Sequence, residues 1–147
     1  KLMHLGCNTV IKTLELIEKG NVITTIQTEN AELKTAYKLN KDNCKIDWTR
    51  PGQEIYNQIR GLSPYPAAWT FVEDKGEEWN VKVYEATFEK YQHDKVAGTL
   101  IVEGKDIKVF TIDGFLVLKS LQFPGKRRMN AKEMLNGMSF TNEAKAF

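Results

Sequence analysis

Basic side chains gather near the end of the chain and offer phosphate-binding chemistry. Five of them fall within 14 residues that contain no acid, and three stand together just before a predicted helix start. Lysine and arginine beside the free N–H groups of a helix start are common ligands of nucleic-acid phosphates. The cluster is compatible with RNA contact or with an ordinary solvated patch of a soluble domain, and the balance of 14 basic and 14 acidic side chains in residues 46–147 does not favour nucleic acid. The cluster comprises Lys119, Lys126, Arg127, Arg128 and Lys132.

Other residue types that do chemistry lack the partners they would need. His4 lies in a helical stretch and His93 in the polar loop "YQHDK", and neither belongs to a nucleophile–base pattern. Cys7 and Cys44 are interpreted as two reduced thiols, since their number makes no disulfide framework and their spacing does not indicate zinc. The acidic "EDKGEE" is typical of a solvated turn. With no P-loop or dinucleotide fingerprint, we expect no catalytic residue, metal or bound cofactor in this chain.

Three tryptophans have rings that can stack on RNA bases. Trp48, Trp69 and Trp79 stand in apolar stretches, which favours packing in the core over base stacking.

Alternating apolar residues predict five strands. The apolar face of the second strand changes from Val81 and Val83 to Tyr84 and Ala86, which predicts a β-bulge. Asp113-Gly114 predicts a hairpin turn. The predicted strands are "AAWTFVE", "EWNVKVYEATFEK", "VAGTLIVE", "IKVFTI" and "FLVLKSLQF".

Five curved antiparallel strands, one long and bulged, are typical of a small barrel. The predicted fold is mainly β with flanking helices: a five-stranded OB-like Greek-key barrel preceded by a leftover helix and a linker. An SH3-like barrel is the competing architecture.

The chain divides into three predicted parts. Residues 1–20 form a helix that we interpret as the remnant last helix of an upstream domain, since its apolar stripe has no nearby partner. Residues 21–45 form a linker, with a short helix starting at Asn30. Residues 46–147 form the barrel domain.

Two further helices are predicted in the barrel domain. The first starts at Asp47 or Thr49, before Pro51, and presents Ile55, Ile59 and Leu62 to the core. The second spans 130–137, where Asn130 and Glu133 hold the positions of a capping box.

The segment "IRGLSPYPAAW" (59–69) is interpreted as a structural corner between a helix and the first strand. Pro64 and Pro66 each fix a backbone φ angle and favour an extended chain. Trp69 and Tyr65 are expected to pack, and Arg60 to make a polar contact.

The composition, 41% hydrophobic and 27% charged, is typical of a soluble protein, and apolar runs such as "FLVL" are far shorter than a membrane span. We expect a cytoplasmic monomer without a membrane partner.

Three ordered segments resemble the C-terminal third of the methionyl-tRNA formyltransferase family. "KLNKDNCKIDW" resembles its linker, "IYNQIRGLSPYPAAW" its most recognisable C-terminal motif, and "LQFPGKRRMNAKEMLNG" its closing segment. The N-terminal "LGCNTVIKTLELIEKG" resembles the last helix of the family's catalytic domain. Ala67 stands where relatives commonly carry Gly, and we expect it to be harmless in an extended backbone.

The resemblance implies a two-domain enzyme. Its N-terminal domain transfers a formyl group from 10-formyltetrahydrofolate to the amino group of methionine on initiator Met-tRNA. The family's catalytic Asn, His and Asp belong to that domain, and no position here matches them. The linker and barrel would help to hold the tRNA through Lys41, with Lys38 as a neighbour, and through Lys126, Arg127 and Arg128.

Two alternatives stay open. One is the C-terminal domain of another formyltransferase, acting on an amino-sugar nucleotide, for which the "PGKRRM" loop has no evident use. The other is a free-standing OB-type module that binds RNA or protein.

Overall fold

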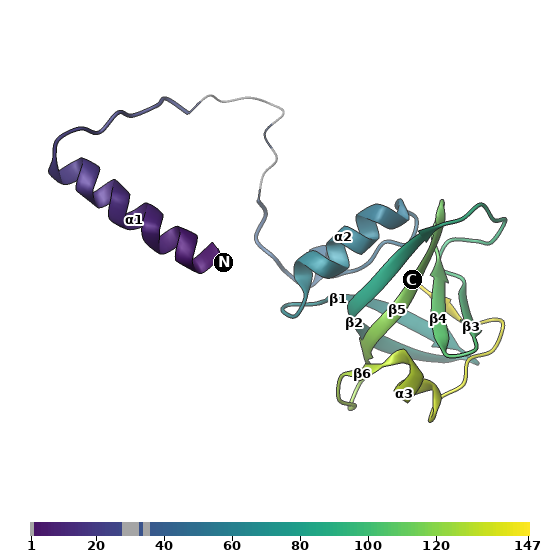
Figure 1. The fold of residues 1–147 in the computed structure, drawn as a ribbon. Helices are drawn as coiled ribbons and strands as arrows, with labels where there is room; N and C mark the ends of the chain where they lie inside the picture. Colours follow the sequence, from purple (N-terminus) through teal and green to yellow (C-terminus); the bar gives the residue numbers. More distant parts are fainter. Residues whose placement is uncertain (1, 28–32, 34–35) are drawn as a thin grey trace. The chain divides into compact units, whose positions relative to one another are not determined.

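The computed structural model describes residues 2–27, 33 and 36–147, and divides the chain into two units, residues 1–37 and 38–147 (Figure 1). In the first unit, α1 (Leu2–Glu18) has no buried residue. It ends before Gly20, which takes a φ of 65° as a helix-terminating glycine does. The short helix predicted from Asn30 begins outside the described residues, and residues 36–40 are not helical.

The second unit is a mainly β, nearly closed barrel-like sheet with flanking helices (Figure 1). Its strand order is β3-β4-β5-β2-β1-β7, and β6 pairs with β5. All five predicted strands are present, whereas β6 and β7, of two residues each, were not predicted. The strands are β1 (Ala68–Asp74), β2 (Glu77–Lys90), β3 (Leu100–Glu103), β4 (Asp106–Phe110), β5 (Gly114–Gln122), β6 (Met129–Asn130) and β7 (Lys145–Ala146).

The short β7 joins the two ends of the sheet. It pairs with β1 through Val72 and Ala146, and a single bridge links Lys145 to Thr99, just before β3. The Ala146 N–H donates to the Gly98 carbonyl at 2.8 Å. Since these bonds use backbone groups that an open edge would leave unpaired, β7 and the residues beside it cover part of the open edges of β1 and β3.

The predicted bulge in β2 is confirmed. Its pairing with β5 shifts register between Val83 and Glu85 and again between Glu85 and Ala86. The shift exchanges the buried face at the predicted point, and it bends the long strand around the barrel.

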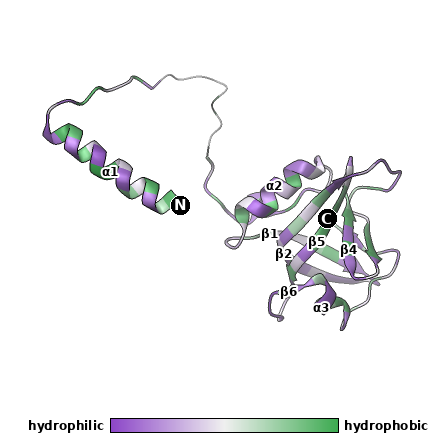
Figure 2. Cartoon of the chain, in the orientation of Figure 1, coloured by the Kyte–Doolittle hydropathy of each residue, from purple (hydrophilic) through white to green (hydrophobic). Residues whose placement is uncertain are grey.

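Branched aliphatic side chains from five strands fill the barrel interior. In Figure 2, much of β5 is coloured hydrophobic, in agreement with its nearly continuous burial. Trp48 is buried and its Nε1–H donates to Thr70 Oγ1 at 2.9 Å, which confirms a packing role for this ring. The most deeply buried members are Val81, Val83, Leu100, Ile107, Val109, Leu116, Leu118 and Leu121.

The helix α2 (Gly52–Leu62) packs against β2 and also touches β5 and β1. Its buried side chains are Ile55, Ile59 and Leu62, as predicted. The expected cap from Asp47 or Thr49 is wrong, because the Asp47 carboxylate instead accepts bonds from Thr49 N and Oγ1.

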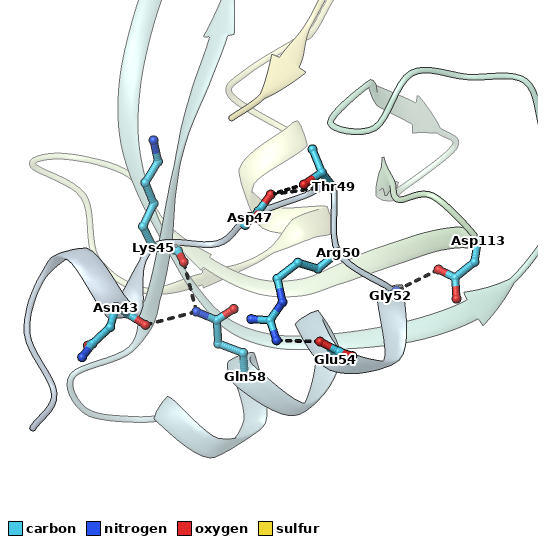
Figure 3. A network of polar contacts seen from close by, with 9 residues as sticks. All are labelled: Asn43, Lys45, Asp47, Thr49, Arg50, Gly52, Glu54, Gln58 and Asp113. Carbon is cyan, nitrogen blue, oxygen red and sulfur yellow. Dashed lines mark hydrogen bonds and ion pairs between the residues drawn. The ribbon is translucent and has the colours of Figure 1, made fainter. Parts of the chain in front are cut away.

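The N-terminus of α2 is capped from a distant hairpin. Asp113, in the turn between β4 and β5, accepts a hydrogen bond at 2.8 Å from Gly52 N (Figure 3). The turn holds Asp113 in place, since Thr111 Oγ1 donates to the same carboxylate oxygen at 3.1 Å. The predicted hairpin is confirmed, with Gly114 serving as the first residue of β5.

The segment before α2 includes the short 3-10 helix η1 (Asp42–Cys44). Hydrogen bonds from a side chain of α2 hold this segment in place. Gln58 Nε2 donates to the carbonyls of Lys45 at 3.0 Å and Asn43 at 3.4 Å (Figure 3). Residues 42–45 are therefore part of the barrel unit.

The last helix is α3 (Ala131–Leu135). Its predicted cap is confirmed, because the Asn130 side chain accepts a 2.8 Å bond from Glu133 N.

Candidate nucleic-acid interface

The loop between β5 and β6 carries the basic segment and is bound to the sheet below it. Tyr84 OH donates to Gln122 Oε1 at 2.7 Å, and Gln122 Nε2 donates to the Lys126 carbonyl at 3.0 Å. Arg128 Nε donates to Ser120 Oγ at 2.7 Å, and the guanidinium lies 4.6 Å from the centre of the Tyr84 ring. These contacts hold Arg128 in one place while its side chain stays exposed.

Arg127 and Lys132 are less constrained. Arg127 is 75% exposed and lies 3.8 Å from Glu133, a distance at which a surface ion pair contributes little. Lys132 is exposed on α3. Lys119, which the sequence groups with them, pairs instead with Asp106 at 3.3 Å on the neighbouring strand.

At the β1 end of the same sheet face, the segment before α2 presents two lysines over aromatic rings. Trp69 Nε1 donates to the Lys41 carbonyl at 2.7 Å, and Lys41 Nζ lies 5.3 Å from the ring centre of Trp69. Lys45 Nζ lies 5.7 Å from Trp69, 5.2 Å from Phe71 and 5.8 Å from Phe147. Cation–π contacts of this kind hold each ammonium group at the surface of the sheet.

One row of paired residues connects these two basic regions. Trp69 on β1 pairs with Lys82 on β2, and Lys82 pairs with Gln122 on β5. Directly paired residues point to the same face of a sheet, so Lys82 lies between the linker and the loop. We call Lys41, Lys82, Lys126 and Arg128 the basic strip.

Two surface hollows follow the basic strip. A hollow of ≈ 400 Å³ includes Lys41 and Trp69, and one of ≈ 290 Å³ includes Gln122 and Gly125. Both are lined by Asn80 and Lys82, so the hollows meet at β2.

Sequence reasoning missed Lys82 and Tyr84. Lys82 has the appearance of an ordinary solvated strand residue, and only the register of three strands places it between Lys41 and the loop. Tyr84 lies at the predicted bulge, but its contact with Arg128 could not be predicted from a local pattern, because the two residues are 44 positions apart.

The predictions for the corner at 59–69 are confirmed in part. Arg60 Nε donates to Asn57 Oδ1 at 2.9 Å, the expected polar contact, and Trp69 is buried. The expected packing of Tyr65 is wrong, because its side chain is 89% exposed. Ala67 is also not extended: its φ is 72°, and its N–H turns back to the Leu62 carbonyl at 3.0 Å.

The two prolines of the corner lie on either side of Tyr65, and the Ser63-Pro64 and Tyr65-Pro66 peptide bonds are both cis. Pro64 is exposed and Pro66 half-buried. Together they form the turn that joins α2 to β1.

The histidines have structural surroundings. Lys95 N donates to His93 Nδ1 at 3.1 Å, so the ring proton lies on Nε2, which donates to the Gly114 carbonyl at 3.0 Å. His4 is exposed on α1. Among the described residues, no group of three or more His, Cys, Asp or Glu side chains could hold a metal ion.

Three displaced pKa values have local structural causes. Hydrogen bonds from Thr49 lower the pKa of Asp47, and hydrogen bonds from Thr141 lower that of Asp74. The bond between Lys108 and the Glu103 carboxylate raises the pKa of Lys108. Each group is used in a contact within the fold, so the shifts do not mark a reaction centre.

No helix in the described part of the chain has the length and apolar character needed to span a membrane.

The sequence profile of the formyl transferase C-terminal domain matches residues 38–139. Methionyl-tRNA formyltransferase of Flavobacterium johnsoniae is 58% identical over 147 residues, covering 100% of this chain and 47% of that protein. The enzyme of the same name from Bacteroides fragilis is 42% identical over 150 residues, covering 99% of this chain and 46% of that protein. The chain thus spans about half the length of these curated relatives.

A solved structure shares the fold. HypX from Aquifex aeolicus, crystallised with tetrahydrofolic acid, is 19% identical, with a TM-score of 0.54 over 86% of this chain and 22% of HypX. At this identity the likeness concerns the fold alone.

Proposed function

Because the chain belongs to the formyl transferase C-terminal domain family, we propose that it is the tRNA-assisting C-terminal part of a methionyl-tRNA formyltransferase. The proposed parent enzyme formylates the amino group of methionine on initiator Met-tRNA, with 10-formyltetrahydrofolate as donor. It acts as a cytoplasmic monomer, and the chemistry belongs to an N-terminal catalytic domain. Residues 1–20 are the last helix of that domain, 21–45 the linker, whose last residues pack in the barrel unit, and 46–147 the C-terminal domain.

One observation carries the proposal of tRNA contact. The basic strip brings Lys41 of the linker and the 126–128 loop together across β1, β2 and β5, with Lys82 between them. Backbone phosphates of a folded RNA are the ligands that such spaced cations fit, since each cation replaces counterions on one phosphate. Arg127 and Lys132 extend the strip as exposed neighbours.

We assign the barrel to the OB-like Greek-key type. Its strand order places the β3-β4-β5 meander beside the β2-β1 hairpin, and a long connection leads from β2 to β3. Three consecutive strands next to a fourth that is joined by a long connection form a Greek key. OB-type barrels commonly bind nucleic acids on one sheet face.

The folate donor has no proposed site in the barrel unit. The resemblance assigns the donor and the catalytic Asn, His and Asp to the N-terminal domain, and no position in this chain matches those residues. We therefore expect no formyl transfer from this chain alone, even with donor and charged tRNA, and turnover by the purified chain would contradict the proposal.

The alternatives are less well supported. An amino-sugar nucleotide has no evident use for cations spread from the linker across β2 to the β5–β6 loop, and the similar curated proteins bear the methionyl-tRNA name. A free-standing module is disfavoured because the chain aligns along its whole length with about half of each larger relative.

A salt titration of initiator tRNA binding to this chain tests the proposal. We expect log K to fall with log salt, and to fall more weakly by about one slope unit per lost phosphate contact when Arg127 and Arg128 are both replaced by Ala. Lys90→Ala/Lys105→Ala removes the same charge from exposed sites on β2 and the β3–β4 turn and should leave the slope nearly unchanged.

A single-stranded RNA of equal length serves as the substrate control, and binding should prefer the folded tRNA. An equal salt slope for wild type and the Arg127/Arg128 variant would show that those two residues make no phosphate contact. No binding at low salt would contradict a tRNA-binding role for this chain.

A further inference from the structure

Tyr65 presents an aromatic ring to water at one end of the basic strip. Its side chain is 89% exposed, although an aromatic side chain of this size usually packs. Pro64 and Pro66 fix the backbone on both sides, and the bond from Ala67 N to the Leu62 carbonyl closes the turn. The ring is therefore displayed from a rigid turn.

Next to this ring lies the ≈ 400 Å³ hollow of the basic strip, which Tyr65 helps to line. This volume lies within the range of small-ligand sites. Its lining is both apolar and polar. The apolar members are Leu39, Cys44, Pro66, Ala67 and Trp69, and the polar members besides Tyr65 are Asn40, Lys41, Asn80 and Lys82.

The chemistry of the hollow matches the parts of one nucleotide. An exposed aromatic face stacks on a nucleobase, whichever base it is. The Asn80 amide offers both a donor and an acceptor to a base edge. Lys41 and Lys82 are cations within reach of a phosphate at the same hollow.

We propose that Tyr65 and this hollow form a subsite for a single unpaired RNA nucleotide. The base stacks on Tyr65, and Lys41 and Lys82 hold the adjoining phosphate. A paired base cannot do this, because its faces are covered within the helix and only unstacked bases reach aromatic side chains. This subsite rests on the proposed RNA contact and adds to it a preference for an unpaired position.

The test uses an RNA hairpin whose strands are joined by a non-nucleotide linker and which carries one bulged 2-aminopurine, and the same linker-closed hairpin without the bulge. For Tyr65→Ala we expect a loss of affinity of about 10- to 100-fold for the bulged hairpin, the range of one lost base stack. Its salt slope should stay unchanged, because no phosphate contact is removed. Affinity for the fully paired hairpin should stay the same.

Two variants separate stacking from general damage. Tyr65→Phe keeps the ring and should bind like wild type. Tyr91→Ala removes another exposed tyrosine, in the loop after β2, and should have no effect on either hairpin. Quenching of 2-aminopurine fluorescence on binding, present with wild type and Tyr65→Phe and absent with Tyr65→Ala, reports the stack itself.

Equal affinity of wild type and Tyr65→Ala for the bulged hairpin would overturn the subsite, as would equal losses on both hairpins. If wild type binds tRNA with a salt-dependent affinity but shows no Tyr65 effect, the subsite fails and the proposed function stands. If wild type binds neither tRNA nor hairpins at low salt, both fail.

Discussion

At the scale of single residues, Ala67 holds a conformation that costs energy. Its φ of 72° is in the left-handed region, where the steric clash of the Cβ of an L residue costs about 1–2 kcal/mol of conformational free energy. The sequence predicts an extended residue here, because the prolines before it favour an extended backbone. A Gly at this position would adopt this φ without the steric cost of a Cβ.

Replacing Ala67 by Gly should therefore change the free energy of unfolding by less than about 0.5 kcal/mol. The gain from the relieved φ offsets the lost burial of one methyl group and the greater freedom of Gly in the unfolded chain. Ala68→Gly is the matched control, since Ala68 is equally buried in β1 but has no positive φ. It should cost about 1–2 kcal/mol in urea denaturation, and equal costs at both positions would contradict this account.

Tyr65 and Lys82 show where residue-level prediction fails. The exposure of Tyr65 depends on the direction in which the corner turns, which Ala67 sets and no local pattern reveals. The place of Lys82 depends on the pairing of β2 with strands before and after it. Lys41, Lys126, Arg127, Arg128 and Lys132 were predicted as RNA contacts from the sequence, and that role stays a prediction.

At the scale of elements, one hairpin supports a helix 61 residues away. Asp113 caps α2 through Gly52 N, and Gly52 lies so close to the Phe88 ring and Thr111 that a Cβ there would collide with them. The β4–β5 turn thus fixes the start of α2, and α2 in turn leads into the corner that displays Tyr65.

Asp113→Ala should destabilise the chain by about 1–2 kcal/mol, the range found for lost helix caps. The exposed Asp94→Ala, in the loop after β2, provides a charge-matched control and should cost less than about 0.5 kcal/mol. Chemical denaturation followed by circular dichroism measures both variants, and equal stabilities would exclude the cap.

Element prediction succeeded where the pattern was local. The five main strands, the bulge in β2, the buried stripe of α2 and the Asn130 cap each depend on residues within a few positions of one another. The cap of α2 and the strands β6 and β7 depend on remote partners, and two-residue strands have no alternation to detect.

At the scale of the whole barrel unit, a carboxylate secures the chain that leads into β7. Asp74, at the end of β1, is 4% exposed and accepts bonds from Thr141 Oγ1 and, at 3.0 Å, from Thr141 N. These bonds lower the pKa of Asp74. Its folded pKa is therefore below the unfolded value, so the folded state binds fewer protons than the unfolded state when the pH lies near these pKa values.

The stabilisation by Asp74 should be complete above about pH 5 and decline as the pH falls through the folded pKa. At pH 7, Asp74→Asn should cost about 1.5–3 kcal/mol, the range for hydrogen bonds to a charged group. Urea denaturation from pH 7 to pH 3 should show the wild type approaching the variant. A difference that is independent of pH would show that the carboxylate charge is not responsible.

Because β7 follows all other strands in the sequence, β1 is synthesised well before the strand that covers its edge. Val72 pairs with Ala146, and at about 5–20 residues per second a ribosome needs about 4–15 s to make the intervening chain. Through that interval the nascent β1 has one edge without a partner, where another unfinished chain could pair. Glu73 and Asp74 place two charges at the end of that edge, so like-charged neighbours on a polysome repel one another until residues 145–147 emerge.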